Sequence, residues 1–358
     1  MEWVKLGDLV EITKGKKVEE SKNKSEKSFR YIQIEDLRND DNIKYTEDPK
    51  ATIVNKGHVL IAWDGANAGT VGFNLEGAIG STISALEINE LYKNEFSSEF
   101  LGYYLKSKNH YLRATSTGAT IPHINRIALL KLKIPKMNKV NQLAIVGTFK
   151  EIEKIINIRK EQIQAYDELI ESLFFEMFGD IRINDKNFLL KKWKDVLNIV
   201  NGKNQKKVEN PEGKFPIYGS GGIMSYADDW LTKENSIIIG RKGNINKPIF
   251  VKEKFWNVDT AFGLEPNTNI LNANYLFGFC QVFNFERLNK AVTIPSLTKK
   301  DLLEIDIPIP PIELQNKFAD YVLKIEEEKK KLNASLLELE GLFNSLMEDA
   351  FSGNLFKE

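Results

Sequence analysis

The sequence contains a long internal repeat, and this repeat limits the fold more than any other feature. The segment Gly118–Pro135 aligns without a gap with Ala291–Pro308, at an offset of 173 residues. Both copies carry Thr-Ile-Pro near the start, Leu-Leu in the middle and Ile-Pro at the end, and Gln142 matches Gln315 in the same register. A chain of 358 residues that repeats itself in this way is expected to fold as two related modules.

The match continues upstream more weakly and at other offsets. Gly57–Gly65 resembles Asn235–Gly243, and Asp8–Gly15 resembles Asp195–Gly202. Each half therefore has a variable N-terminal part, which we call its front, and a better-matched C-terminal part, which we call its back. Short apolar runs bounded by Gly, Asn, Asp and Pro predict strands in the fronts, at Val59–Ala62, Leu132–Ile134 and Ser236–Ile239. Polar capping residues predict helices at Ser98–Leu105 and Ala273–Phe283.

The back of each half is a heptad pattern. Apolar residues recur at alternating intervals of four and three, which is typical of a coiled-coil seam. The first seam contains Ile145, Phe149, Ile152, Ile156, Ile163, Tyr166, Ile170 and Leu173, and the second contains Phe318, Val322, Ile325, Leu332, Leu336, Leu339, Phe343 and Leu346. Each helix is about 50 Å long. Loop length allows parallel or antiparallel pairing, and a duplicated chain favours the antiparallel arrangement with a pseudo-two-fold axis.

These patterns predict an α+β fold. We expect two mixed α/β modules, residues 1–136 and 182–309, separated by two long antiparallel coiled-coil helices in residues 137–181 and 310–358. No run approaches 18 apolar residues, which argues against a membrane span. The first residues also lack the apolar core of a signal peptide, so we expect a soluble cytoplasmic protein.

Residue types needed for catalysis or metal binding are scarce. The single cysteine, Cys280, cannot form an internal disulfide, and His58, His110 and His123 are scattered and do not recur between the halves. The chain lacks the Gly-x-x-x-x-Gly-Lys-Ser/Thr loop, a Gly-x-Gly cofactor fingerprint after a strand, and the Asn/Asp-Pro-Pro-Tyr/Phe motif of amino-methyltransferases. We therefore expect no catalytic residue, no metal ligand and no cofactor in this chain.

The formal net charge is zero, with 50 basic and 50 acidic side chains, and a DNA-binding protein is usually basic. Its distribution is uneven, however. Residues 140–180 carry −4 and residues 311–350 carry −4, so the rest of the chain carries +8. One interpretation is that the solvated helix faces merely happen to be rich in glutamate. The other is that the modules bind a polyanion and the helices do not.

Several local clusters suit contact with phosphates or bases. The loop Arg241–Asn246 follows an expected strand and combines cations, amides and glycine, which suits Arg on guanine and Asn on adenine. Its counterpart Trp63–Asn67 has aspartate where the second half has lysine. The candidate DNA-binding residues are Lys16, Lys17, Trp63, Asn67, Arg126, Lys206, Lys207, Tyr218, Ser220, Arg241, Lys242, Asn244, Asn246, Lys299 and Lys300. For each loop, an ordinary surface hairpin is the alternative interpretation.

The whole pattern resembles the specificity subunit of type I restriction-modification systems. The residues that carry the resemblance are the repeat Gly118–Pro135 with Ala291–Pro308, the two heptad helices, and Tyr218–Ile223 with Gly240–Gly243. The resemblance implies that each module is a target recognition domain for one half of a bipartite double-stranded DNA site. It also implies that the helices pair as an antiparallel ruler, on which two modification (methyltransferase) subunits dock and restriction (translocase-nuclease) subunits join them. S-adenosylmethionine and ATP are then expected on the partner subunits.

Two other functions remain open at this stage. A coiled-coil scaffold that binds proteins through both modules would not bind random DNA libraries at low salt. A nuclease hidden in the modules would cleave DNA with divalent metal, although no acidic metal cluster is evident. The leading hypothesis is a non-catalytic DNA-recognition subunit, whose half-site centres lie about one DNA turn, or 10 base pairs, apart.

Overall fold

The computed structural model describes residues 2–118, 120–289 and 294–352. The chain divides into two compact units. Unit 1 contains residues 1–159 and 335–358, and unit 2 contains residues 160–334. None of the helices in the described residues is long and apolar enough to cross a membrane.

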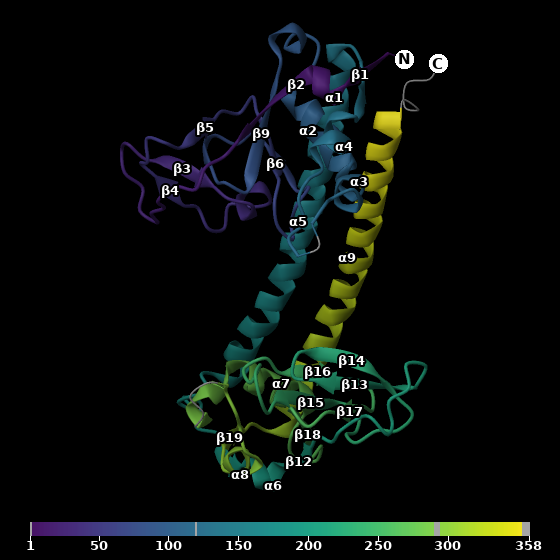
Figure 1. The fold of residues 1–358 in the computed structure, drawn as a ribbon. Helices are drawn as coiled ribbons and strands as arrows, with labels where there is room; N and C mark the ends of the chain where they lie inside the picture. The colour runs from purple at the N-terminus through teal and green to yellow at the C-terminus, as the bar shows by residue number, and fades with distance from the viewer. Residues whose placement is uncertain (1, 119, 290–293, 353–358) are drawn as a thin grey trace. The chain divides into compact units, whose positions relative to one another are not determined.

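Unit 1 contains two four-stranded sheets and a two-stranded ribbon. The sheet orders are β2-β9-β6-β7 and β4-β3-β8-β5, and the ribbon pairs β1 with β10. Helix α2 packs on β6 and β7 (Figure 1). The elements are β1 (Trp3–Lys5), α1 (Leu6–Leu9), β2 (Val10–Lys14), β3 (Phe29–Ile32), η1 (Glu35–Leu37), β4 (Tyr45–Thr46), β5 (Thr52–Val54), β6 (Val59–Ala62), β7 (Val71–Phe73), β8 (Gly77–Ile79), β9 (Ile83–Ile88), η2 (Glu90–Tyr92), α2 (Ser98–Ser107), α3 (Asn109–Ala114), α4 (Arg126–Leu130) and β10 (Lys133–Pro135).

Unit 2 repeats this plan. Its sheets have the orders β12-β18-β15-β16 and β14-β13-β17, and its ribbon pairs β11 with β19. The elements are β11 (Leu189–Lys192), α6 (Trp193–Val196), β12 (Leu197–Asn201), β13 (Phe215–Gly219), β14 (Gly222–Ala227), β15 (Ser236–Gly240), β16 (Ile249–Val251), β17 (Trp256–Asn257), β18 (Ala261–Pro266), α7 (Ala273–Val282), η3 (Phe285–Leu288), α8 (Lys299–Leu303) and β19 (Asp306–Ile309).

The order and direction of the strands confirm the duplication. In each unit one pair is parallel, β3 with β8 and β13 with β17, and both pairs stand at the same place in the chain. Strand β5 is the exception, because no described strand of unit 2 takes the corresponding place. The five helices and strands predicted from the sequence are all present, and their ends lie within two residues of the expected positions. The fold class predicted from the sequence is therefore correct.

Two long helices follow the repeated modules. Helix α5 spans Lys139–Phe178, helix α9 spans Ile312–Ser352, and Gly179 ends α5 with a φ of 71° that favours glycine. Within unit 1 the ring of Phe149 on α5 lies 5.6 Å from that of Phe343 on α9. Within unit 2 the ring of Phe174 lies 5.6 Å from that of Phe318. Figure 1 shows the two helices running in opposite directions within each unit.

The heptad seam faces inward in both units. All sixteen predicted seam residues are buried or half-buried, whereas Leu143, Leu337 and Leu342 on other helical faces are exposed. Ile145 and Phe149 also belong to the same core cluster as α2 and the first sheet. This packing explains why each compact unit includes parts of both helices, instead of leaving the helices as segments separate from the modules.

A buried glutamine joins each long helix to its module. In unit 1 the carboxamide of Gln142 donates to the carbonyls of Glu95 (2.6 Å) and Met137 (2.9 Å) and accepts from the backbone N–H of Ser97 (3.0 Å). In unit 2 the carboxamide of Gln315 makes the equivalent three bonds, at 3.0, 2.8 and 2.8 Å. The sequence match at these positions therefore reflects one backbone junction that is repeated in the two units.

Candidate nucleic-acid interface

The loop after β6 in unit 1 is fixed by backbone hydrogen bonds. The N–H of Trp63 donates to the carbonyl of Thr82 at 2.7 Å, and the N–H of Gly65 donates to that of Pro122 at 2.9 Å. The N–H of Ile124 donates in turn to the carbonyl of Trp63 at 2.9 Å. The Thr-Ile-Pro segment of the repeat therefore supports the loop.

The loop after β15 in unit 2 has the same three bonds. The N–H of Arg241 donates to Thr260 (2.8 Å), the N–H of Gly243 donates to Pro295 (3.2 Å), and the N–H of Leu297 donates to Arg241 (2.9 Å). Trp63 and Arg241 are thus structurally equivalent. By the same pairing, Asp64 in the first loop corresponds to Lys242 in the second.

The unit 1 loop presents a carboxylate between two basic side chains. The Asp64 carboxylate lies 3.1 Å from the Nζ of Lys14 and 2.6 Å from the Nδ1 of His123. Partial burial raises the pKa of Asp64, but the hydrogen bonds and charges of His123 and Lys14 outweigh it and lower the pKa below its ordinary value. An ionised carboxylate at this position can accept hydrogen bonds from the amino group of a base.

Asp64 and His123 were not among the candidate DNA-binding residues predicted from the sequence, whereas Lys14 belongs to the basic cluster around Gly15 that also contains Lys16 and Lys17. The one signal available in the sequence was that aspartate replaces lysine at the aligned position of the second loop. The histidine looked isolated because its partner is 59 residues away. Such a contact can be found only after β6 and the Thr-Ile-Pro segment are paired.

The unit 2 loop presents cations instead. Arg241, Lys242 and Asn244 are exposed, and the Arg241 guanidinium lies 5.8 Å from the centre of the Phe262 ring. Among the residues that the structure describes, neither Arg241 nor Lys242 forms an ion pair, so both charges are available to a ligand. The loop containing Ser220 lies beside them, because a Cβ added to Gly243 would be 3.8 Å from the Ser220 Oγ.

Three further candidates are partly occupied by contacts within the fold. The Tyr218 ring is buried in β13 and packs edge-on against Phe255 at 5.6 Å, and burial raises the pKa of its hydroxyl. Trp63 is half-buried against the core of unit 1. The Asn67 carboxamide oxygen accepts a hydrogen bond from the Arg38 guanidinium at 2.6 Å.

Two more candidates support the backbone. The Asn246 carboxamide oxygen accepts from the N–H of Phe285 at 2.8 Å, close to the start of η3. The Nζ of Lys299 donates to the carbonyl of Ile199 at 2.5 Å. Both side chains are thereby oriented by the protein itself, which gives each of them a structural role.

The remaining candidates are surface cations. Exposed side chains are found at Lys16, Lys17, Arg126, Lys206, Lys207 and Lys300. Lys16 and Lys17 follow Gly15, where an added Cβ would lie 2.2 Å from the Gly80 carbonyl oxygen, and this close approach of the two backbone segments explains the glycine. Thr293, the threonine of the second Thr-Ile-Pro segment, lies outside the described residues. In residues 2–118, 120–289 and 294–352, no group of three or more His, Cys, Asp or Glu is placed to hold a metal ion.

Known proteins show the same organisation. The family model of the type I restriction modification DNA specificity domain matches residues 1–165 and 185–339. The type I restriction enzyme MjaVIII specificity subunit of Methanocaldococcus jannaschii is 25% identical over 369 residues, covering 91% of this chain and 86% of that protein. The MjaIX specificity subunit of the same organism is 23% identical over 309 residues, covering 75% and 71%.

A solved structure has the same fold. The S subunit of a type I restriction-modification system from M. genitalium matches with a TM-score of 0.61 at 19% identity, covering 98% of this chain and 96% of that one. The resemblance found in the repeat and the heptads is therefore confirmed over nearly the whole chain. This protein belongs to the type I restriction-modification DNA specificity family, whose members are non-catalytic subunits that recognise DNA sequence.

Proposed function

We propose that each unit recognises one half of a bipartite double-stranded DNA site. The observation that carries the proposal is the pair of equivalent loops, which have the same backbone support and opposite charge. Asp64 stands in one and Lys242 in the other. Two surfaces built alike and charged differently are suited to two different base sequences.

The chemistry of each loop indicates what it contacts. The Arg241 side chain suits the two acceptors of guanine in the major groove, and the Asp64 carboxylate suits the amino group of cytosine. The surface cations, such as Lys206, suit phosphate oxygens, which supply affinity and register without base preference. Two half-sites joined by a spacer add their binding free energies. One short half-site alone would discriminate too weakly against the many competing sites of a genome.

In this proposal the partner subunits, and not this chain, methylate and cleave the DNA. We infer that two modification subunits dock on the paired helices and bind S-adenosylmethionine, and that restriction subunits join them and use ATP. The chain's membership of the specificity family supports this assignment. In this arrangement the specificity subunit binds DNA and positions its partners on the target.

Substitutions in the two loops test the bipartite reading. In the assembled complex, Arg241→Ala is expected to relax one base position of one half-site by about 1–3 kcal/mol, and Asp64→Ala to relax a position in the other half-site. Lys206→Ala, the control, is expected to weaken binding to all sequences alike. The measurement is selection from a random DNA library at fixed salt. Loss of preference in the same half-site for both variants would contradict the proposal.

The helices are proposed as the ruler of the spacer. Removing residues 157–163 from α5 and 330–336 from α9 preserves both heptad seams and shortens each helix by about 10 Å. The preferred spacer is then expected to shorten by about three base pairs. The same library, sequenced with variable spacers, measures this change. An unchanged spacer would mean that something else sets the separation.

A further inference from the structure

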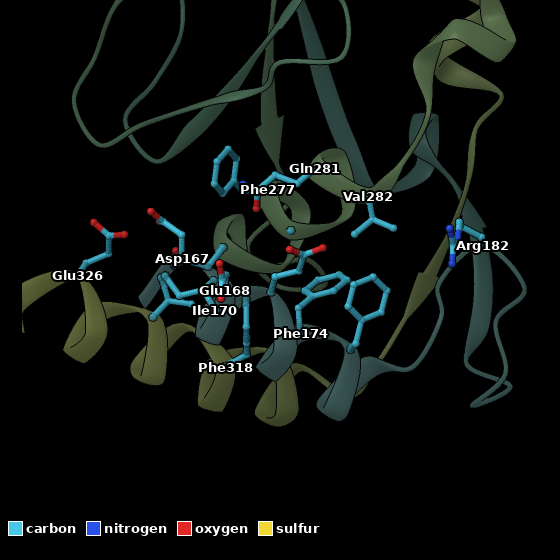
Figure 2. A pocket seen from close by; sticks show the side chains of 15 residues that line it. Asp167, Glu168, Ile170, Phe174, Arg182, Phe277, Gln281, Val282, Phe318 and Glu326 are labelled. Atoms are coloured by element: carbon cyan, nitrogen blue, oxygen red, sulfur yellow. The ribbon is translucent and has the colours of Figure 1, made fainter. Parts of the chain in front are cut away.

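A cavity of about 630 Å³ opens on unit 2 between α7, the C-terminal part of α5 and the N-terminal part of α9. Figure 2 shows Phe277, Gln281 and Val282 of α7 on one side and Ile170, Phe174 and Phe318 of the long helices on the other. The cavity is thus an apolar groove at the surface, distant in the sequence from the two post-strand loops.

The rim of the groove is acidic. Asp167, Glu168, Glu171 and Glu326 line it. Lys329 forms an ion pair with Asp167 and lies 3.8 Å from the Glu326 carboxylate. The Glu168 carboxylate accepts a hydrogen bond from the neutral carboxamide of Gln164 at 2.9 Å. Arg182 also lines the groove, but its guanidinium is bonded to Asp180 at 2.6 and 2.7 Å. The charge balance favours a cationic occupant and repels phosphates.

The equivalent place in unit 1 shows which chemistry fills it. Ser97 and Asn272 are the N-caps of α2 and α7, and each donates its backbone N–H to the buried glutamine of its unit. When α2 and α7 are aligned on these N-caps, Tyr103 corresponds to Gly278 and Lys106 corresponds to Gln281. On the long helices, the offset of the repeat places Glu153 opposite Glu326.

In unit 1 the chain fills this place with its own side chains. The Tyr103 hydroxyl donates to the Glu153 carboxylate at 2.6 Å, and the Nζ of Lys106 donates to the same carboxylate at 2.8 Å. The Lys106 ammonium also lies 5.2 Å from the centre of the Tyr103 ring. An aromatic ring and an adjacent cation therefore satisfy the glutamate and cover the apolar surface.

In unit 2 both of these side chains are absent. Gly278 has no side chain, and an added Cβ would meet the Phe174 ring at 2.5 Å, so a tyrosine cannot stand there. Gln281 is neutral and exposed. Unit 2 therefore retains the glutamate, as Glu326, but lacks the phenol and the cation that contact Glu153 in unit 1, and the groove remains open.

We propose that this groove binds a segment of a partner protein that presents a lysine or arginine beside an aromatic side chain. The incoming pair takes the place that Tyr103 and Lys106 hold in unit 1. Because that place is filled in unit 1, each chain binds one such segment, although its two halves are duplicated. The inference does not depend on the DNA contacts proposed above.

A labelled helical peptide carrying tyrosine and lysine three positions apart, as at residues 103 and 106, tests the proposal by fluorescence polarisation on the full chain. We expect binding with one site per chain and no binding of the matched peptide with glutamate in place of lysine. Gln281→Lys supplies the cation internally, and Glu168→Lys reverses a rim charge, so each is expected to weaken binding by about tenfold or more. Glu161→Lys, outside the groove, is the control for net charge.

Several results would overturn the proposal. These are equal binding of the two peptides, no binding of either, two sites per chain, or equal weakening by Glu161→Lys. Competition by a short DNA duplex on a chain that carries Arg241→Ala would assign the groove to nucleic acid instead. Unfolding of each variant is followed in parallel, and Glu171→Gln provides a mild second variant if Gln281→Lys fails to fold.

Discussion

Replacing Gln142 or Gln315 by alanine removes the same three hydrogen bonds from the two units. In unit 1 the substitution leaves the carbonyls of Glu95 and Met137 without a donor and the N–H of Ser97 without an acceptor. Both glutamines are fully buried, so water does not reach the carboxamide in the native state. The Met137 bond is itself buried, whereas the other two are partly buried.

The burial of each bond sets the size of the effect. An unsatisfied buried carbonyl costs about 1–3 kcal/mol, and each of two partly buried partners that regain water costs about 1 kcal/mol. Each substitution is therefore expected to destabilise its own unit by about 3–5 kcal/mol. At about 1.4 kcal/mol per factor of ten, this corresponds to an increase of about 100- to 5,000-fold in the population of the open state.

Hydrogen exchange followed by mass spectrometry resolves the units separately. Gln142→Ala should accelerate exchange in peptides that cover Ser97, and Gln315→Ala should accelerate it in peptides that cover Asn272. Leu143→Ala is the matched control, because this neighbour on α5 is 59% exposed. An acceleration below about fivefold, or a large effect of only one of the two glutamine substitutions, would refute the reasoning from equivalent junctions.

Two further predictions concern the backbone and the charge cluster. Gly202→Ala would place a Cβ 1.8 Å from the carbonyl oxygen of Val258 and is expected to destabilise unit 2 by about 3 kcal/mol or more. Gly147→Ala, whose Cβ would have nothing within 4 Å, should stabilise α5 by up to about 1 kcal/mol. Thermal unfolding measures both variants, and equal shifts of Tm would contradict the prediction. The folded-state pKa of Asp64 lies below its ordinary value of 3.8, so the carboxylate stabilises the fold above that value and this contribution is lost as the pH falls through the lowered pKa. The Tm advantage of the wild type over Asp64→Asn should therefore shrink as the pH falls from about 5 to below about 4. A difference that does not change over this interval would contradict the assigned charge state.

Much of the candidate site could be predicted from the sequence, but the role of each side chain could not. The repeat aligned the loops after β6 and β15 correctly, and the structure brings Ser220 beside the second of them. Judged by residue type alone, Lys299 and Asn246 look like residues that contact DNA. Their partners, the backbone of Ile199 and of Phe285, are 100 and 39 residues away, so only the folded chain shows that they are engaged.

The sequence by itself determined the duplication, the inward seam of the two long helices and the family. These features depend on periodicity and on matching segments, which are properties of neighbouring residues along the chain. The tertiary structure alone decided that Asp64 lies between Lys14 and His123, and that a groove is filled in unit 1 and open in unit 2. Those outcomes depend on side chains from elements that are distant in the sequence. The difference between Tyr103 in unit 1 and the equivalent Gly278 in unit 2, for example, decides whether the apolar surface beside it is covered or exposed to solvent.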